Sequence, residues 1–311
     1  MADLQQYIFF DFEMLCSNRG MKFEEMEVIR LGAVKYNLQT KEISYFDRYI
    51  RPQSHKRLTR FCKELTGISD EDLKNASDFK EVFAEFLYWV GGVKRSQFFS
   101  WSKSDLARLK IDAARHGLPP RTIQKIEKRY VDFQAIFSKR VTKTHFSVEN
   151  AVELYGKKFI GDKHNPMWDA YNTLQIYLCF LNDRLNSDLI MLKQYVFDEI
   201  PTDFEKINSG LTKAMKNDIS TLYKEGKDLI KMSDAYKFMK KANRLAHKYE
   251  NIIINRSGIF SKKNVEYARS IGRFYEDLCA AYDIHKKFSS KVMILDEHSV
   301  RPLQHLVTIG G

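Results

Sequence analysis

The sequence predicts an α/β domain over residues 1–182, followed by an all-helical domain over residues 183–311. Strand-like and helix-like segments alternate along the first part, which is typical of a layered α/β domain. From about Asn182 onward the apolar residues recur only at helical spacing. A chain of 311 residues is long enough for two domains of modest size, and no stretch of flexible linker composition separates the two parts.

Five short segments of the first part are rich in aromatic and β-branched residues, which predicts strands. They are residues 7–12, 28–36, 44–51, 97–101 and 130–132. Short connections join the first three segments, so we expect them to form an antiparallel meander.

Apolar residues at helical spacing predict the helices of the first part. The clearest helix covers residues 78–90, and one of its faces carries Phe79, Val82, Phe83, Phe86, Leu87 and Val90. Residues 147–154 and 169–181 predict two further helices.

Sequence patterns predict three helices in the second part. Pro201 is followed by Thr202 and Glu205 at the spacing of a capping box, and Ser261 begins another helix. Between them, residues 234–249 predict an amphipathic helix. The polar side of this helix carries a basic stripe, which consists of Lys237, Lys241, Arg244 and Lys248. The stripe could extend a track for nucleic acid, but a charged helical face is more often only solvated.

The composition limits the class of protein. A net charge of +11, shared by both parts of the chain, favours a protein that binds polyanions over one with plain solubility charge. The apolar runs are too short to span a membrane, and the N-terminal residues lack the pattern of a secretory signal. The four cysteines show no zinc-binding spacing, so we expect reduced thiols in a cytoplasmic protein.

Two carboxylates stand at the end of the first predicted strand. Side chains alternate along a strand, so Asp11 and Glu13 are expected to project from the same face. Neighbouring carboxylates repel one another unless a cation lies between them, and hard divalent cations suit this position. The alternative for this segment alone is an acidic turn exposed to water.

Three more polar residues lie at the ends of predicted elements. Asp105 falls in the first turn of a helix that follows the strand at residues 97–101, and His164 precedes Asp169, which opens the helix at residues 169–181. Taken singly, either aspartate could be a helix N-cap, and the histidine could be a surface loop residue.

Taken together, these positions resemble the three motifs of the DEDDh 3′–5′ exonuclease superfamily, which includes RNase T and the proofreading subunit of the bacterial replicative polymerase. The first motif, D-x-E, matches Asp11 and Glu13, the second matches Asp105, and the third, H-x4-D, matches His164 and Asp169. Coincidence does not explain well why five positions match in the family order.

The resemblance is strongest to the Eri-type exoribonucleases and the bacterial KapD-like group. Residues 58–68, LTRFCKELTGI, are similar to a segment of that subgroup. There are two departures: Ser102 stands where these relatives usually have Gly, and Trp168 stands where a second Asp is common. Neither position is a metal ligand in the family pattern, so we expect altered substrate contacts and retained chemistry.

The resemblance implies an RNase H-like exonuclease fold, in which helices flank a mixed five-stranded sheet. It also implies a 3′–5′ exonuclease acting on single-stranded nucleic acid, with RNA preferred. Two Mg²⁺ or Mn²⁺ ions would be held by Asp11, Glu13, Asp105 and Asp169, with His164 as the general base.

Other parts of the functional interpretation stay open. Met14, Leu15, Trp101 and Lys163 are candidate substrate contacts, although packing is an equal or more common role for the apolar ones. A DNA exonuclease for repair, proofreading or defence is the alternative within the enzyme class. A catalytically weak nucleic-acid-binding or adaptor protein is the alternative outside it, and residues 183–311 could dock a protein partner.

Overall fold

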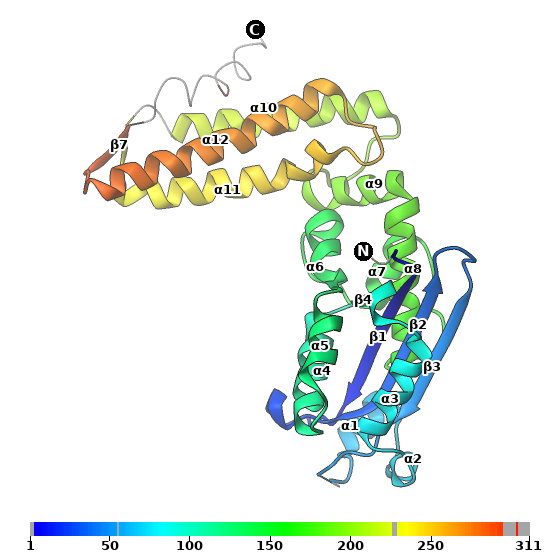
Figure 1. Ribbon diagram of the computed structural model, residues 1–311. Coiled ribbons are helices and arrows are strands. Elements are labelled where there is room, and N and C mark those ends of the chain that lie inside the picture. Colours follow the sequence, from blue (N-terminus) through cyan, green and yellow to red (C-terminus); the bar gives the residue numbers. More distant parts are fainter. Residues whose placement is uncertain (1–2, 55, 226–228, 295–302, 304–311) are drawn as a thin grey trace. The chain divides into compact units, whose positions relative to one another are not determined.

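A mixed five-stranded sheet forms the centre of the first of two units into which the chain divides (Figure 1). Its strand order is β3-β2-β1-β4-β5, in which the β1–β2 and β2–β3 pairs are antiparallel and the β1–β4 and β4–β5 pairs are parallel. The strands are β1 (Gln6–Met14), β2 (Val28–Asn37), β3 (Ile43–Tyr49), β4 (Ser96–Ser100) and β5 (Tyr130–Asp132). The predicted mixed sheet and its antiparallel meander are confirmed.

This computed structural model describes residues 3–54, 56–225, 229–294 and 303. The first unit comprises Met1–Lys139 and Thr144–Asp183, and the second comprises Arg140–Lys143 and Arg184–Gly311. Each unit has its own hydrophobic core. Among the described residues, no helix is both long enough and apolar enough to cross a membrane.

One face of the sheet is covered by three helices. Ile8, Phe10 and Phe12 of β1 point to this face and join a buried cluster with residues of the helices. The helices are α3 (Phe79–Val90), α4 (Lys103–Arg115) and α5 (Pro120–Glu127). Helix α3 begins at the N-cap Asp78 and ends at Gly91 in a left-handed conformation, as expected from its amphipathic pattern.

The opposite face of the sheet carries α8 (Pro166–Asn182). Tyr177 of this helix packs against Phe9 of β1 and Phe99 of β4, with ring centroids 5.5 and 4.7 Å apart. The helix starts three residues earlier than predicted, because Asn165 is its N-cap and Pro166 fits the first helical position. Asp169 therefore lies in the first turn of α8 and does not open it.

Shorter helices complete the first unit. They are η1 (Phe23–Glu25), α1 (Arg60–Thr66), α2 (Asp70–Lys74), η2 (Val93–Arg95), α6 (Phe133–Phe137) and α7 (Val148–Leu154), and the π-helical turn η3 (Ser138–Thr142) spans the boundary between the units. The α1–α2 region packs near the end of β1 and the start of β2 through a small cluster that includes Leu15, Ile29 and Cys62.

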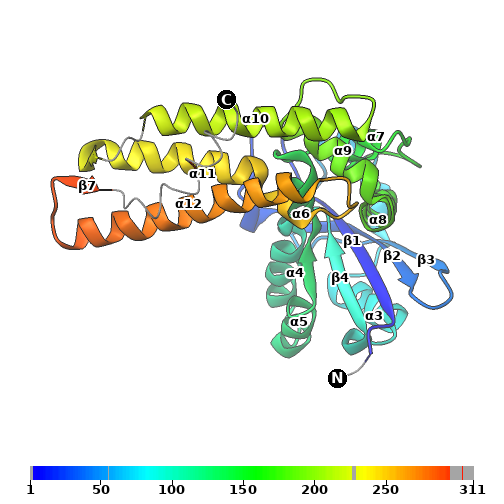
Figure 2. The same cartoon turned by 90° about the horizontal axis from the view of Figure 1, so that it is seen from above.

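The described part of the second unit is built mainly of helices, as Figures 1 and 2 show. They are α9 (Arg184–Tyr195), α10 (Phe204–Glu225), α11 (Met232–Ile254) and α12 (Lys262–Lys287). Long helices α10, α11 and α12 lie alongside one another, and their apolar faces form one buried cluster. Ser261 is the N-cap of α12, as predicted, and accepts a hydrogen bond from the backbone of Asn264.

Two local expectations for this unit were wrong. The start of α10 is held by Asp203, whose side chain accepts a hydrogen bond from the backbone N–H of Lys206 at 2.7 Å, and not by the pair Thr202 and Glu205. The unit is also not all-helical, because β6 (Leu229–Lys231) pairs with β7 (Val292–Ile294) in a two-stranded antiparallel sheet. Three-residue strands are too short to produce a recognisable alternation in the sequence.

Candidate active site

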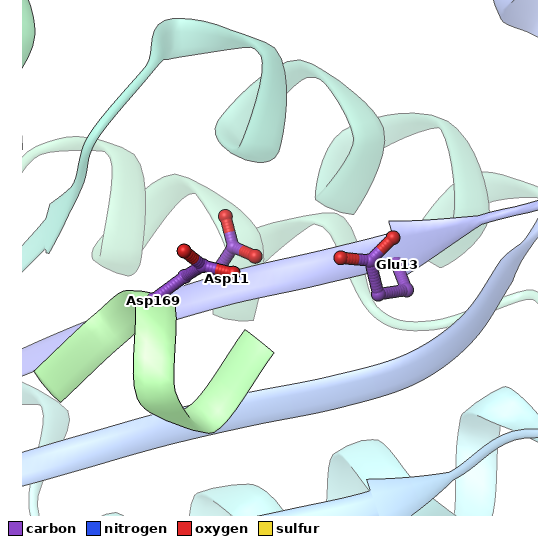
Figure 3. Close-up of side chains that lie close together, drawn as sticks. All are labelled: Asp11, Glu13 and Asp169. Atoms are coloured by element: carbon purple, nitrogen blue, oxygen red, sulfur yellow. The ribbon is translucent and has the colours of Figure 1, made fainter. Parts of the chain in front are cut away.

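Three carboxylates from distant parts of the sequence meet beside the sheet. Asp11 and Glu13 project from the same face of β1, and Asp169 comes from the first turn of α8. One oxygen from each of the three lies within 4.8 Å of the others. Figure 3 shows the carboxyl groups of Asp11 and Asp169 turned toward one another, with that of Glu13 farther along β1.

The spacing of residues along α8 explains how this helix brings Asp169 to the sheet. Asp169, Thr173 and Tyr177 recur every four residues and therefore lie on one face of the helix. Tyr177 packs on the aromatic residues of β1 and β4, so the same face delivers Asp169 to the polar end of β1. The hydroxyl of Thr173 donates to the carbonyl of Asp169 at 2.8 Å within this turn.

Gly32 of β2 allows α8 to come this close to the sheet. It is the register partner of Asp11. A Cβ atom at this position would lie 2.0 Å from the backbone nitrogen of Met167 and 2.2 Å from the carbonyl carbon of Pro166. No role for Gly32 was predicted from the sequence, although a glycine inside an apolar strand is a known signal of close backbone approach.

Asp105 extends the cluster on the side of α4. It is buried, and its carboxyl group forms a side-chain hydrogen bond with that of Asp11. The backbone N–H groups of Phe12 and Ser102 also donate to it. Two carboxyl groups can share a hydrogen bond only when one of them carries a proton, or when a cation replaces that proton.

Burial raises the pKa of all four carboxyl groups, and repulsion from neighbouring carboxylates adds to this for Asp11 and Glu13. Burial raises the pKa of Asp105 and of Asp169 to about 7. Burial, followed by the charge of Asp169, raises the pKa of Glu13 to about 8. The pKa of Asp11 lies well above its ordinary value, because burial is reinforced by the charges of Asp105, Asp169 and Glu13.

The nearest cation does not relieve this repulsion. Arg30 lowers the pKa of Glu13 somewhat, but its guanidinium binds Asp47 with two hydrogen bonds of 2.8 and 2.6 Å. The cluster therefore has an excess of negative charge and only carboxylate oxygens as donors. This donor set fits hard divalent cations, which prefer oxygen ligands.

His164 lies on the loop that leads into α8. Its backbone adopts a left-handed conformation with a φ of 58°, which few residues other than glycine adopt. Its backbone N–H donates to the carboxylate of Asp169, which favours the charged form of that group. The side chain of His164 is exposed to solvent.

The four candidate substrate contacts have different surroundings. Leu15 is 3% exposed and belongs to the cluster beside α1 and α2. Trp101 is 7% exposed, packs against Phe133 and Phe137, and donates its indole N–H to a backbone carbonyl at 2.9 Å. This burial argues against direct contact of either side chain with a nucleotide.

Met14 and Lys163 differ from these two buried residues. Met14 is half-buried and packs partly on the core of the sheet. The ammonium group of Lys163 lies 2.5 Å from the carboxylate of Glu149 on α7, and its side chain is 58% exposed. Contact of Met14 or Lys163 with a substrate stays a prediction.

Comparison with known proteins identifies relatives of the first unit. A sequence model described as Exonuclease (RNase T) matches residues 8–177. Human ERI1 exoribonuclease 2 is 27% identical over 188 residues, which cover 53% of this chain and 27% of that protein. Human 3′-5′ exoribonuclease 1 is 26% identical over 184 residues, which cover 56% and 51%. The chain thus spans about half the length of these curated relatives, or less.

Solved structures show the same fold. The nuclease domain of 3′hExo, a DEDDh family member bound to rAMP, superposes with a TM-score of 0.52 and is 24% identical. The match covers 58% of this chain and 95% of that domain. Cell-death related nuclease 4 gives a TM-score of 0.51 at 22% identity.

Proposed function

The chain belongs to the RNase T exonuclease family, and from this premise we propose that it hydrolyses single-stranded nucleic acid from the 3′ end with the help of divalent cations. The observation that carries the proposal is the meeting of Asp11, Glu13 and Asp169, with Asp105 hydrogen-bonded to Asp11. An active enzyme of this family needs these four carboxylates on one site, and a chain that only inherited the fold has no need to keep so costly a cluster.

The cluster is suited to hold two divalent cations, Mg²⁺ or Mn²⁺. Such ions neutralise the charge that develops on a phosphoryl group and lower the pKa of a water molecule near the phosphorus. The protein's part is to fix the donors: β1 holds Asp11 and Glu13, α4 holds Asp105, and α8 holds Asp169. Asp11, which interacts with the other three carboxyl groups, would contribute a central ligand to such ions.

His164 is proposed as the general base. An imidazole exchanges protons near neutral pH, and this one is accessible beside Asp169. In the proposed reaction the ring accepts a proton of the attacking water, whose oxygen bonds to phosphorus as the bond between phosphorus and the leaving 3′ oxygen breaks. The leaving oxygen takes up a proton from water. A nucleoside 5′-monophosphate is then released, and the shortened strand keeps a 3′ hydroxyl.

RNA is proposed as the preferred substrate, because the curated relatives are named exoribonucleases. Single-stranded DNA is the alternative. Residues 184–311 of the second unit lie outside the region that the family match covers, and a protein partner that docks there is part of the proposal.

End-labelled strands test the proposal directly. Single-stranded RNA and DNA, each with a free or a blocked 3′ end, are incubated with Mg²⁺, Mn²⁺ or EDTA. We expect stepwise shortening from the free 3′ end, faster on RNA, and none with a blocked 3′ end or in EDTA. Shortening from the 5′ end, or full activity in EDTA, would contradict the proposal. Binding without any shortening would favour the catalytically weak alternative.

A further inference from the structure

The loop between α7 and α8 carries His164 beside Asp169, although few of the loop's own side chains are packed against the protein. Residues 156–158 and 160–164 are exposed, and Phe159 is only half-buried. An exposed segment of this kind samples many conformations unless specific contacts restrict it. Productive proton transfer requires the base to be within hydrogen-bond reach of the water.

Asn172, two turns into the helix that follows, supplies the missing restraint. Its side chain is 1% exposed. The Oδ1 atom accepts from the backbone N–H of Ile160 at 3.0 Å, and the Nδ2 atom donates to the carbonyl of the same residue at 2.8 Å. Nδ2 also donates to the carbonyl of Trp168 at 2.8 Å. One buried amide thus binds both backbone groups of a loop residue to α8.

A second contact fixes the next residue of the loop. Gly161 has a φ of +82°, and a Cβ atom there would lie 2.2 Å from the Cγ atom of Trp168. The Trp168 ring therefore occupies the space that a side chain at position 161 would need. Because Trp168 belongs to the same turn of α8 that Asn172 binds, the two contacts anchor Ile160 and Gly161 to one rigid element.

The other end of the segment is fixed by the start of α8. Asn165 is the N-cap and accepts from the backbone of Met167 at 3.2 Å. Between Gly161 and Asn165 only three residues remain, and the last of them is His164, whose backbone N–H binds Asp169. The segment is therefore held at both ends.

We infer that Asn172 is a positioning residue that holds the His164 loop in place against the carboxylate site. The inference rests on the proposed function, because it assigns to Asn172 an effect that acts through His164. Asn172 touches neither the substrate nor the carboxylate cluster; it acts through the backbone of Ile160.

Kinetics of Asn172→Ala and of a matched control variant test this role. Asn172→Ala should lower kcat on single-stranded RNA by about ten- to a hundredfold, since a displacement of about 1 Å costs a catalytic group that much. KM and the Mg²⁺ concentration for half-maximal rate should stay within about twofold, because the carboxylates are not moved. Asn264→Ala is the matched control. It removes a fully buried asparagine of the second unit that also binds a backbone carbonyl, at 2.9 Å, and should leave kcat unchanged.

A double variant separates positioning from a general structural effect. If Asn172 acts through His164, adding Asn172→Ala to His164→Ala should lower kcat by less than about threefold further. Losses that multiply in the double variant would overturn the inference, as would a wild-type kcat in Asn172→Ala. A wild-type protein without 3′–5′ exonuclease activity would contradict the proposed function instead.

Hydrogen exchange tests the contact without relying on activity. The backbone N–H of Ile160 is bound by the Asn172 side chain, so it should exchange at least about tenfold faster in Asn172→Ala, with α4 unchanged. Equal exchange at Ile160 in the two proteins would overturn the inference whatever the catalytic result.

Discussion

At the scale of single residues, the carboxylate cluster that the proposed function requires lowers the stability of the folded protein. Asp11 repels three carboxylates and is desolvated as well, so its charged form destabilises the folded protein without a cation. Such a cluster is expected to be less stable than a neutral one of the same shape, and selection for activity keeps it.

Asp11→Asn should therefore separate activity from stability. The substitution keeps the volume and removes one charge, so we expect turnover to fall by at least about a thousandfold. In EDTA the variant should melt about 2–4 °C above the wild type, the shift that about 1 kcal/mol produces in a protein of this size. Thermal unfolding followed by circular dichroism measures this difference, and a lower Tm than that of the wild type would contradict it.

The raised pKa values also predict how stability depends on pH. The ordinary pKa values are 3.8 for Asp and 4.5 for Glu, whereas Asp105 and Asp169 titrate at about 7 and Glu13 at about 8 in the folded protein. The folded state thus binds more protons than the unfolded state between these limits. Protonation of these carboxyl groups therefore stabilises the folded state. This contribution to the free energy of unfolding is fully present below about pH 4 and is lost as the pH rises through about 7 to 8.

Divalent cations replace those protons, so their effect on stability should grow over the same range. We expect the rise in Tm on adding Mg²⁺ to be small near pH 5.5 and to increase toward about pH 8. Asp11→Asn is the control and should show a smaller rise at every pH. A rise in the wild type that does not change with pH would argue against a cation within the carboxylate cluster.

At the scale of elements, the contact between α8 and β2 decides whether the site exists. The strands and α4 place three carboxylates, and the fourth comes on a helix that has to rest directly on the backbone of β2. Gly32 makes this contact possible, since only hydrogen occupies the space facing Met167.

Gly32→Ala should move the start of α8 away from the sheet. The new methyl group would meet backbone atoms, which cannot rotate aside, so Asp169 should be displaced from Asp11. We expect at least about a hundredfold loss of kcat and a lower Tm. Gly272→Ala is the matched control, because a Cβ at that helical position meets nothing within 4 Å and should leave both quantities nearly unchanged. Wild-type activity in Gly32→Ala would show that α8 is not placed by this contact.

At the scale of the whole molecule, the basic stripe on α11 was predicted either to extend a track for nucleic acid or to be only a solvated face. Lys241, Arg244 and Lys248 line a hollow of about 280 Å³ with Asp218 of α10. Lys248 lies 2.6 Å from the Asp218 carboxylate, which also accepts from the hydroxyl of Tyr249. Part of the positive charge is therefore already neutralised within the second unit, which argues against a track for nucleic acid along this stripe.

Replacing Lys237, Lys241 and Arg244 by Gln distinguishes the two roles. For a solvated face we expect the affinity for single strands of about 10 and about 30 nucleotides to change less than twofold, with an unchanged dependence on salt. Binding titrations at two salt concentrations measure both. A weaker affinity for the longer strand alone, with a salt slope reduced by about two or more, would assign the stripe to nucleic acid.

The sequence by itself determined the features that depend on residues close together in the chain. Strand alternation fixed the common face of Asp11 and Glu13, and local apolar patterns gave the strand ends to within two residues. The family motifs named Asp105, His164 and Asp169 because the order and spacing of these residues match the family pattern. The role of each of these residues stays a prediction.

Only the tertiary structure decided which distant residues touch. The contact of Gly32 with Met167 joins positions far apart in the sequence, and no local pattern specifies the approach of two backbones. The burial of Leu15 and Trp101 likewise depends on elements that pack over them. The binding of Ile160 by Asn172 depends on how a loop folds back on the next helix. Such contacts follow from how the elements pack in three dimensions, which a one-dimensional pattern does not encode.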